Sequence, residues 1–283
     1  MGAGICFFGM KRVYEYLATY GLLLILAALI LGWTVLTVVL LSPLPRHRRR
    51  AAARYTMMRG FRFFSWLLTA AGAYALDLEA IDTLRGGPPL ILAPNHPTSI
   101  DAILFLAHHP DLACILKPEL MHNVFLGVGA RLAGFIRGDT PRRMVRESLA
   151  ELRRGGVVLL FPEGTRTTRV PLNPLTASAG VIARHAQVPI QLAIIETDSP
   201  YLAKGWSIFR VPRLPIRYQV RLGRRLEPTQ DAVAMTAAIE RELARELAGA
   251  PQNRWLADVH RAPRRDTLSH RPPPQASMDQ ETL

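Results

Sequence analysis

Cysteine is scarce in this chain of 283 residues, where Cys6 and Cys114 are the only two. Two thiols are too few for a disulfide framework or for a cysteine-based zinc site. The chain also lacks the G-x-S-x-G nucleophile elbow of the α/β-hydrolases, which excludes that route to a serine nucleophile. The histidines show no metal-ligand spacing, so we predict no bound metal ion and no cofactor.

Acidic residues are missing from the most basic part of the chain. The formal net charge is +13, and residues 46–62 contain no Asp or Glu. The arginines of this strip are Arg46, Arg48, Arg49, Arg50, Arg54, Arg59 and Arg62. Such a strip is typical of a basic arm that binds nucleic acid. It is also typical of a segment beside a membrane, where each arginine attracts anionic headgroups by roughly 1 kcal/mol.

Charged side chains are absent from residues 16–45, and residues 22–41 are almost continuous Leu, Ile, Val and Ala. About 20 apolar residues cross a bilayer, and arginines on one flank mark its cytoplasmic side. We therefore predict a membrane anchor helix in residues 1–45, with the following domain on the cytoplasmic side of the inner membrane and no nucleic-acid partner. The run is longer than the ~7–15 residues of a signal peptide. A segment that only dips into one leaflet stays open.

Three further segments follow the anchor. Residues 46–76 combine arginines with Phe and Trp, which predicts a helix that lies at the membrane interface or covers the next domain. Residues 77–250 alternate short apolar runs with amphipathic stretches, which predicts an α/β domain with a mainly parallel sheet flanked by helices. Residues 251–283 are polar and proline-bearing, which predicts a disordered tail.

Two polar stretches each follow a predicted buried strand. Asn95–Asp101 (NHPTSID) follows an apolar run at 90–93. Phe161–Arg166 (FPEGTR) begins at the last residue of another apolar run, 156–161. The carboxyl ends of parallel strands share one edge of a sheet, where ligands of open α/β folds bind. We therefore expect the two stretches to face each other across a cleft.

These stretches resemble the motifs of the glycerolipid acyltransferase family, the 1-acylglycerol-3-phosphate acyltransferases and their relatives. The family's H-x-x-x-x-D motif corresponds to His96–Asp101, and its F-P-E-G-T-R motif is complete at Phe161–Arg166. A G-x-I-x-R-like piece lies between them at Gly134–Arg137, and an apolar segment with proline follows at Val188–Ile190. The resemblance covers roughly residues 77–225 and implies that residues 77–250 are an acyltransferase domain.

The resemblance implies a membrane-bound O-acyltransferase that moves a fatty acyl group from acyl-CoA or acyl carrier protein to the free hydroxyl of a lysolipid. The first expectation for that acceptor is 1-acyl-glycerol-3-phosphate, which would give phosphatidic acid. A histidine suits the base at neutral pH because its unperturbed pKa is near ~6.5. We expect His96 to be that base and Asp101 to orient it and stabilise the imidazolium, as in the Ser-His-Asp triad. The substrate hydroxyl takes the place of the serine, so no acyl-enzyme is required.

The resemblance also implies which residues bind the glycerol phosphate of the acceptor. They are Arg137, Glu163, Gly164, Thr165 and Arg166. Arginine forms bidentate hydrogen bonds with phosphate, and glycine permits close backbone approach. Lys117, one of three lysines in the chain, resembles a lysine before the second motif of relatives and is a further candidate. A surface arginine is the alternative for Arg137.

The sequence departs from the family where relatives carry a Phe-Lys-x-Gly piece, because this chain has Leu175-Thr176-Ala177-Ser178. The departure leaves the acceptor open, with a lyso-ornithine lipid or a specialised lipid such as that of aryl-polyene pathways as alternatives. Two other classes also stay open, a non-catalytic membrane-anchored lipid-binding protein and a lipid hydrolase. The predicted partners are membrane lipids, the lysolipid acceptor and the acyl donor.

Overall fold

The computed structural model describes residues 2–123, 126–249, 253, 255 and 256. Its helices are α1 (Gly2–Leu36, continued by a π-helical turn at Thr37–Leu41), α2 (Arg46–Ala70), α3 (Glu79–Asp82), α4 (Asp101–Leu106), α5 (Pro118–His122), α6 (Gly127–Leu132), α7 (Pro141–Leu152), α8 (Ser178–Ala186) and α9 (Ala232–Ala248). Its strands are β1 (Tyr74–Asp77), β2 (Ile91–Pro94), β3 (Leu112–Leu116), β4 (Ile136–Arg137), β5 (Val157–Leu159), β6 (Ile190–Thr197) and β7 (Ile216–Leu226).

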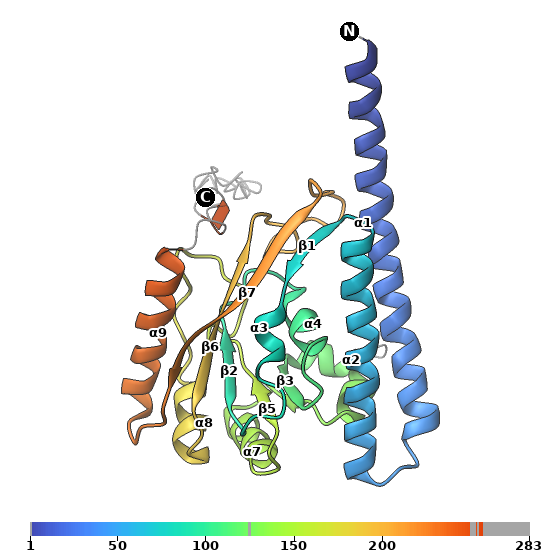
Figure 1. The fold of residues 1–283 in the computed structure, drawn as a ribbon. Coiled ribbons are helices and arrows are strands. Elements are labelled where there is room, and N and C mark those ends of the chain that lie inside the picture. Colours follow the sequence, from blue (N-terminus) through green and yellow to red (C-terminus); the bar gives the residue numbers. More distant parts are fainter. Residues whose placement is uncertain (1, 124–125, 250–252, 254, 257–283) are drawn as a thin grey trace, which may run out of the picture.

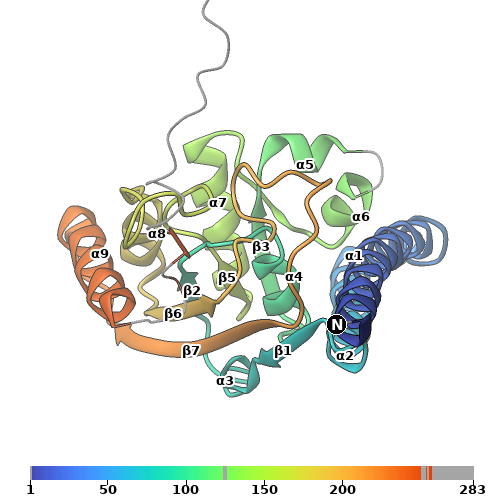
Figure 2. The same cartoon turned by 90° about the horizontal axis from the view of Figure 1, so that it is seen from above.

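The strands form one sheet in the order β1-β7-β6-β2-β5-β3-β4. Every neighbouring pair is parallel except β6 and β7, which run antiparallel. Helices cover both faces (Figures 1 and 2). The predicted mainly parallel α/β sheet is confirmed. Because β2 and β5 are neighbours, the two polar stretches that follow them emerge side by side.

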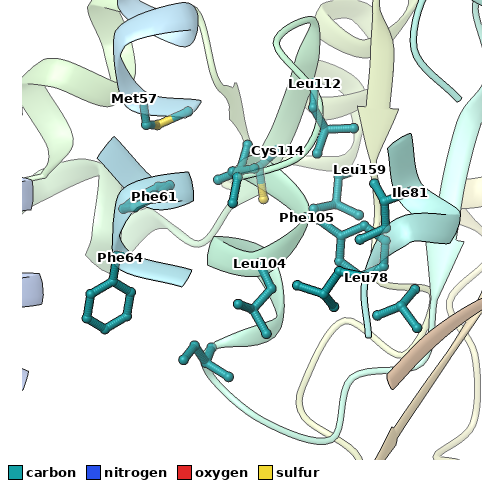
Figure 3. Close-up of a cluster of buried hydrophobic side chains, with 14 of the residues drawn as sticks. Met57, Phe61, Phe64, Leu78, Ile81, Leu104, Phe105, Leu112, Cys114 and Leu159 are labelled. Atoms are coloured by element: carbon teal, nitrogen blue, oxygen red, sulfur yellow. The ribbon is translucent and has the colours of Figure 1, made fainter. Parts of the chain in front are cut away.

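Two apolar cores lie on the two faces of the sheet. One joins α2 and α4 to the sheet and includes Phe64, Leu104 and Phe105 (Figure 3). The other lies under α8 and α9 and includes Ile182 and Ile239. Strand β2 is buried at all four positions, as expected for a central strand covered on both faces.

The first strand differs from the sequence prediction. The helix expected to continue through residue 76 ends at Ala70, and Tyr74–Asp77 form β1 instead. Strand β1 pairs in parallel with β7 at the edge of the sheet, with Tyr74 opposite Ile216. Gly72, with φ of 66°, lies between helix and strand, where a positive φ favours glycine.

Helices α1 and α2 form an antiparallel hairpin against the domain (Figure 1). Residues Gly9–Leu41 are long and apolar enough to cross a membrane by length and composition. One side of α1 packs on α2, where Trp33 Nε1 donates to the Ala53 carbonyl at 3.0 Å. The opposite side exposes Val13, Leu17 and Leu24, the latter two by 71% and 72%. This helix therefore presents an apolar face that the described part of the chain leaves uncovered.

Helix α2 has two unlike faces, and each matches one of the two interpretations left open by the sequence. Met57, Phe61 and Phe64 are buried against the domain (Figure 3). On the other side Phe63 and Trp66 are exposed and stack with their ring centroids 5.7 Å apart. The helix covers the domain with one face and shows aromatic rings with the other.

Arg54 does not belong to the exposed basic strip, which corrects the sequence-based interpretation for this residue. Its guanidinium donates to Glu151 and to the carbonyl oxygens of Ala133 and Gly134, and both charged side chains are 6% exposed. Burial alone would raise the pKa of Glu151, but the hydrogen bonds and charges of Arg54 and Arg154 outweigh it and lower that pKa. This arginine ties α2 to α7 and α6.

Replacing Arg54 by methionine is expected to lower the free energy of unfolding by about 3–5 kcal/mol, because a buried carboxylate loses its main partner. The lowered pKa of Glu151 means that the pair stabilises the fold above the pKa of an unfolded glutamate and loses this effect as the pH falls through the folded value. The deficit of Arg54→Met should therefore shrink as the pH is lowered toward about 4. Thermal unfolding in detergent at several pH values measures this.

Adding Glu151→Gln to the Arg54→Met variant is the control. The second change removes the unpaired charge, so the double variant should recover part of the lost stability. An Arg54→Met variant that unfolds at the wild-type temperature at neutral pH would contradict a stabilising role for the pair.

The disordered tail predicted for residues 251–283 falls almost entirely outside the described residues. Within the part that is described, Asn253 Oδ1 accepts from the Thr197 amide at 3.0 Å, and Trp255 Nε1 donates to the Thr197 carbonyl at 2.9 Å. These two residues therefore lie against the end of β6 rather than in a disordered segment.

Candidate active site

Asn95 marks the point where β2 leaves the sheet and the first polar stretch begins. Its amide nitrogen donates to the Ile195 carbonyl at 3.0 Å, and its oxygen accepts from the Ile195 amide at 2.7 Å. A side chain thus replaces one rung of backbone pairing with β6. The main chain is free to turn at this position, which places His96 above the carboxyl edge of the sheet.

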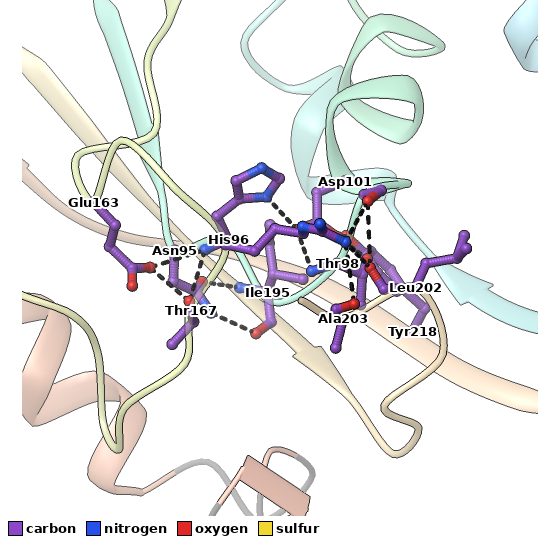
Figure 4. Close-up of polar contacts among 12 residues, drawn as sticks. Asn95, His96, Thr98, Asp101, Glu163, Thr167, Ile195, Leu202, Ala203 and Tyr218 are labelled. Atoms are coloured by element: carbon purple, nitrogen blue, oxygen red, sulfur yellow. Dashed lines mark hydrogen bonds and ion pairs between the residues drawn. The ribbon is translucent and has the colours of Figure 1, made fainter. Parts of the chain in front are cut away.

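His96 and Asp101 form a hydrogen-bonded pair, as expected from the resemblance to the H-x-x-x-x-D motif. His96 Nδ1 lies 2.8 Å from Asp101 Oδ2 (Figure 4). The Asp101 side chain is 0% exposed, and that of His96 is 18% exposed. A carboxylate beside Nδ1 favours the tautomer with its proton on that nitrogen, which leaves Nε2 as the acceptor. The geometry is that of a base held by an acid partner.

Donors from two other elements hold the Asp101 carboxylate. The Thr98 amide donates to Oδ2 at 2.9 Å, and the Thr98 hydroxyl donates to Oδ1. Tyr218 reaches in from β7, and its hydroxyl donates to Oδ1 at 2.7 Å (Figure 4). Burial first, and then the charge of Asp101, raise the pKa of Tyr218 well above its ordinary value. The hydroxyl therefore keeps its proton and remains a donor.

The second polar stretch packs directly on His96. The ring of Phe161 stacks on the imidazole with centroids 3.8 Å apart and planes inclined by 19°. The Thr167 amide donates to the His96 carbonyl at 2.7 Å, and the His96 amide donates back to Thr167 Oγ1 at 3.3 Å. The expectation that the two stretches meet is confirmed: Phe161 and Asp101 contact the imidazole, and Thr167 holds the backbone of His96.

Glu163 lies beneath this junction. Its carboxylate accepts from the His96 amide at 3.2 Å, from the Thr167 hydroxyl at 2.6 Å and from the Asn173 amide at 2.9 Å. The residue is 4% exposed. Burial, the largest effect, raises the pKa of Glu163. The sequence predicts an acceptor contact for Glu163, but these bonds place it as a brace between the loops.

Arg166 bridges three segments at the rim of the site. One guanidinium nitrogen donates to Ser99 Oγ at 2.8 Å and to the carbonyl oxygens of Leu202 and Ala203 at 2.9 and 3.1 Å. Carbonyl oxygens carry no net charge, so these bonds leave the positive charge of the arginine uncompensated. Among the ion pairs of the described residues none includes Arg166.

A cleft of about 540 Å³ opens beside His96. Its lining includes four further residues predicted to bind substrate: Lys117, Gly164, Thr165 and Arg166. Gly164 has φ of 64°, a conformation that favours glycine at this close approach. Arg137 is not among the lining residues, although its neighbour Gly138 is. Apolar side chains such as Leu116 and Leu160 complete the wall.

Cys114 also borders the cleft but is unsuited to nucleophilic chemistry. Burial raises the pKa of its thiol to about 12, so the thiolate is essentially absent at neutral pH. Among the residues that the structure describes, no group of three His, Cys, Asp or Glu side chains is placed to hold a metal ion. That the chain needs no metal stays a prediction.

Four residues that shape the site were not predicted from the sequence: Tyr218, Thr98, Thr167 and Asn173. Thr98 lies within the first motif and Thr167 directly follows the second, so their positions in the sequence could have indicated a place in the site. Tyr218 stands 117 residues after Asp101, on a strand whose pairing was not predicted. Nothing in the local pattern around it indicates a contact with the site.

His96 and the buried Asp101 lie at the carboxyl edge of a mainly parallel sheet, and His96 faces a cleft lined by Lys117 and Arg166. Such a pair is able to act as a general base. Residues 75–195 match the family model described as Acyltransferase. The chain is 26% identical over 191 residues to a 1-acyl-sn-glycerol-3-phosphate acyltransferase of Pseudomonas aeruginosa, covering 65% of this chain and 72% of the relative. It is 28% identical over 200 residues to the mouse (Mus musculus) 1-acyl-sn-glycerol-3-phosphate acyltransferase alpha, covering 68% and 67%.

The fold also matches a solved structure, that of the 1-acyl-sn-glycerophosphate acyltransferase PlsC from Thermotoga maritima. The TM-score is 0.64 at 20% identity, and the match covers 84% of this chain and 96% of that one. In sequence and fold the chain is therefore similar to these acyltransferases.

Proposed function

We propose that this protein is a membrane-attached O-acyltransferase that transfers a fatty acyl group from acyl-CoA or acyl carrier protein to the free hydroxyl of 1-acyl-glycerol-3-phosphate. The observation that carries the proposal is the His96–Asp101 pair, buried on the aspartate side and open to the cleft on the histidine side. The names of the relatives support the acceptor class.

His96 acts as the general base in this proposal. Its Nε2 takes the proton of the acceptor hydroxyl while the hydroxyl oxygen attacks the thioester carbonyl carbon. A C–O bond forms, the C–S bond breaks, and the proton passes from the imidazolium to the leaving thiolate. Asp101 stays ionised throughout and stabilises the imidazolium. The step needs no nucleophile from the protein.

Arg166 and Lys117 are the proposed contacts for the acceptor phosphate. Both line the cleft that contains His96. Arginine presents a planar fork suited to phosphate oxygens, and lysine acts as a point charge. Arg137 is not among the residues that line the cleft, and its backbone amide donates to the Glu147 carboxylate at 3.0 Å. A role for Arg137 in acceptor binding stays a prediction.

The α1–α2 hairpin is the proposed membrane attachment. The exposed apolar face of α1 and the exposed rings of Phe63 and Trp66 on α2 support it, because aromatic side chains favour the membrane interface. The exposed arginines near the turn of the hairpin, including Arg46 and Arg48, suit anionic headgroups. We place the domain on the cytoplasmic side of the inner membrane on the basis of these arginines.

The decisive assay uses purified protein in detergent with labelled acyl-CoA or acyl carrier protein and a panel of lysolipids. We expect labelled phosphatidic acid from 1-acyl-glycerol-3-phosphate. Transfer only to a lyso-ornithine lipid or another specialised acceptor would contradict the proposed acceptor and support the proposed reaction. Release of free fatty acid without transfer would indicate a hydrolase, and binding without turnover would indicate a lipid-binding protein.

Tyr218→Phe is expected to lower kcat by about tenfold and to leave KM nearly unchanged, since it removes one hydrogen bond that orients Asp101. Tyr218 is not among the residues that line the cleft, so its proposed role is positioning. Tyr74→Phe is the matched control, because Tyr74 is also buried and its hydroxyl forms no hydrogen bond with Asp101 among the described contacts. Steady-state kinetics distinguish the two, and equal kcat losses would contradict the positioning role.

A further inference from the structure

The connection between β6 and β7 carries features that the proposed chemistry does not use. Residues 199–215 contain three basic side chains, Lys204, Arg210 and Arg213, and no acidic one. At the tip, Ile208 is 62% exposed and Phe209 is 84% exposed. Exposure of a large apolar ring to water is unfavourable, and an exposed apolar tip with basic flanks is typical of a site that binds another surface.

The base of this connection is firmly held, in contrast to its tip. Tyr201 and Leu214 are buried in the same core as Leu22 of α1. Near the tip, the Tyr20 hydroxyl of α1 donates to the Ile208 carbonyl at 3.2 Å. The exposed Ile208 and Phe209 therefore lie beside α1, whose own uncovered apolar face includes Leu17 and Leu24. The two apolar surfaces belong to one side of the molecule.

A cleft of about 790 Å³ separates the connection from α1, and positive charge dominates its lining. Arg12, Arg210 and Arg213 line it. The guanidinium of Arg210 lies 4.5 Å from the ring centroid of Trp206. Asp198 is the one acid among the lining residues, and its carboxylate already accepts from the Arg217 amide at 2.9 Å.

The same connection reaches the candidate active site at its other end. The Leu202 carbonyl accepts from Arg166 at 2.9 Å and from the Ser99 amide at 3.0 Å. The Ala203 carbonyl accepts from Arg166 at 3.1 Å. Only four residues separate Ala203 from Ile208. A surface that seats the tip would therefore also fix the segment that holds Arg166.

We propose that residues 204–213 are a second membrane-contact site, which inserts Ile208 and Phe209 into the headgroup region of an anionic bilayer beside α1. Apolar and aromatic tips enter the interface while flanking arginines pair with lipid phosphates. The contact rests on the proposed function in one respect, since it would orient Arg166 toward an acceptor that arrives from the bilayer. Its physical test does not depend on turnover.

The test places an environment-sensitive fluorophore at Phe209→Cys in the full chain, with Cys6 and Cys114 first replaced by alanine. The matched control is Val233→Cys, because Val233 is 75% exposed on α9, on the side of the domain away from α1 (Figure 2). Both proteins are reconstituted in vesicles of phosphatidylethanolamine and phosphatidylglycerol, and aqueous iodide is the quencher. We expect iodide to quench the probe at 209 about threefold less than the probe at 233.

A charge variant tests the arginines separately. Arg210→Gln with Arg213→Gln should raise quenching at 209 roughly twofold in anionic vesicles and change little in phosphatidylcholine vesicles. Arg241→Gln with Arg245→Gln on α9 is the control and should change neither. Equal quenching at 209 and 233 would overturn the contact, and so would protection that appears only when acyl carrier protein is added. A protected probe on a protein without transferase activity would keep the contact and reject the proposed function.

Discussion

His96→Ala is expected to lower acyl transfer by about 10⁴- to 10⁶-fold, the loss found when a triad base is removed. Among the described residues that line the cleft, the imidazole is the group that pairs with a buried carboxylate, so we expect it to take the hydroxyl proton. Binding of both substrates should persist, because phosphate contacts remain. Initial rates with labelled acyl-CoA in detergent measure the loss.

His185→Ala is the control for this prediction, since His185 is an exposed residue of α8 outside the cleft lining. It should keep wild-type rates. Thermal unfolding should show that His96→Ala remains folded, because the surrounding loops keep the bonds made by Glu163 to Thr167 and Asn173. Transfer by a folded His96→Ala protein within tenfold of wild type would remove the proposed mechanism.

Asp101→Asn is expected to lower kcat by about 10³- to 10⁴-fold, with a small residual activity. The carboxylate accepts from Thr98 and Tyr218 as well as facing His96. An amide has one oxygen and one NH₂ group, so it cannot accept from all of them. It either turns its NH₂ group toward His96 and imposes the wrong tautomer, or clashes with the other donors. The substitution also removes the negative charge that stabilises the imidazolium.

The measurement compares kcat and KM for Asp101→Asn and for Asp111→Asn, an exposed control five residues beyond α4. KM for both substrates should change little in either variant, because neither side chain binds substrate. A large rise in KM with kcat preserved would assign Asp101 to substrate binding. Loss of folded protein in the Asn variant would show instead that the buried carboxylate mainly supports the loop.

The α/β class and the two facing motifs were accessible from the sequence because both depend on local pattern. Short apolar runs such as Leu90–Ala93 are typical of strands that helices cover on both faces, and Asn and Pro after them favour turns. In a parallel sheet those turns share one edge. The His96–Asp101 contact was expected because the motif resembles that of the glycerolipid acyltransferases, and the structure shows the two side chains within hydrogen-bonding distance at a strand-to-helix turn.

Most of the elements and the edge that carries the site were therefore predictable from the sequence, and the resemblance to known motifs added the partnership of His96 with Asp101. The distant residues that complete the site depend on the tertiary structure. Tyr218 reaches Asp101 because β7 runs antiparallel beside β6. Arg54 is buried, unlike the exposed arginines of the basic strip, because the fold places it against Glu151, which is 97 residues away in the sequence. Glu163 is buried and joins the two loops, and the Asn173 amide donates to its carboxylate. Such contacts depend on strand order and helix docking, which a local pattern of apolar and charged residues does not encode.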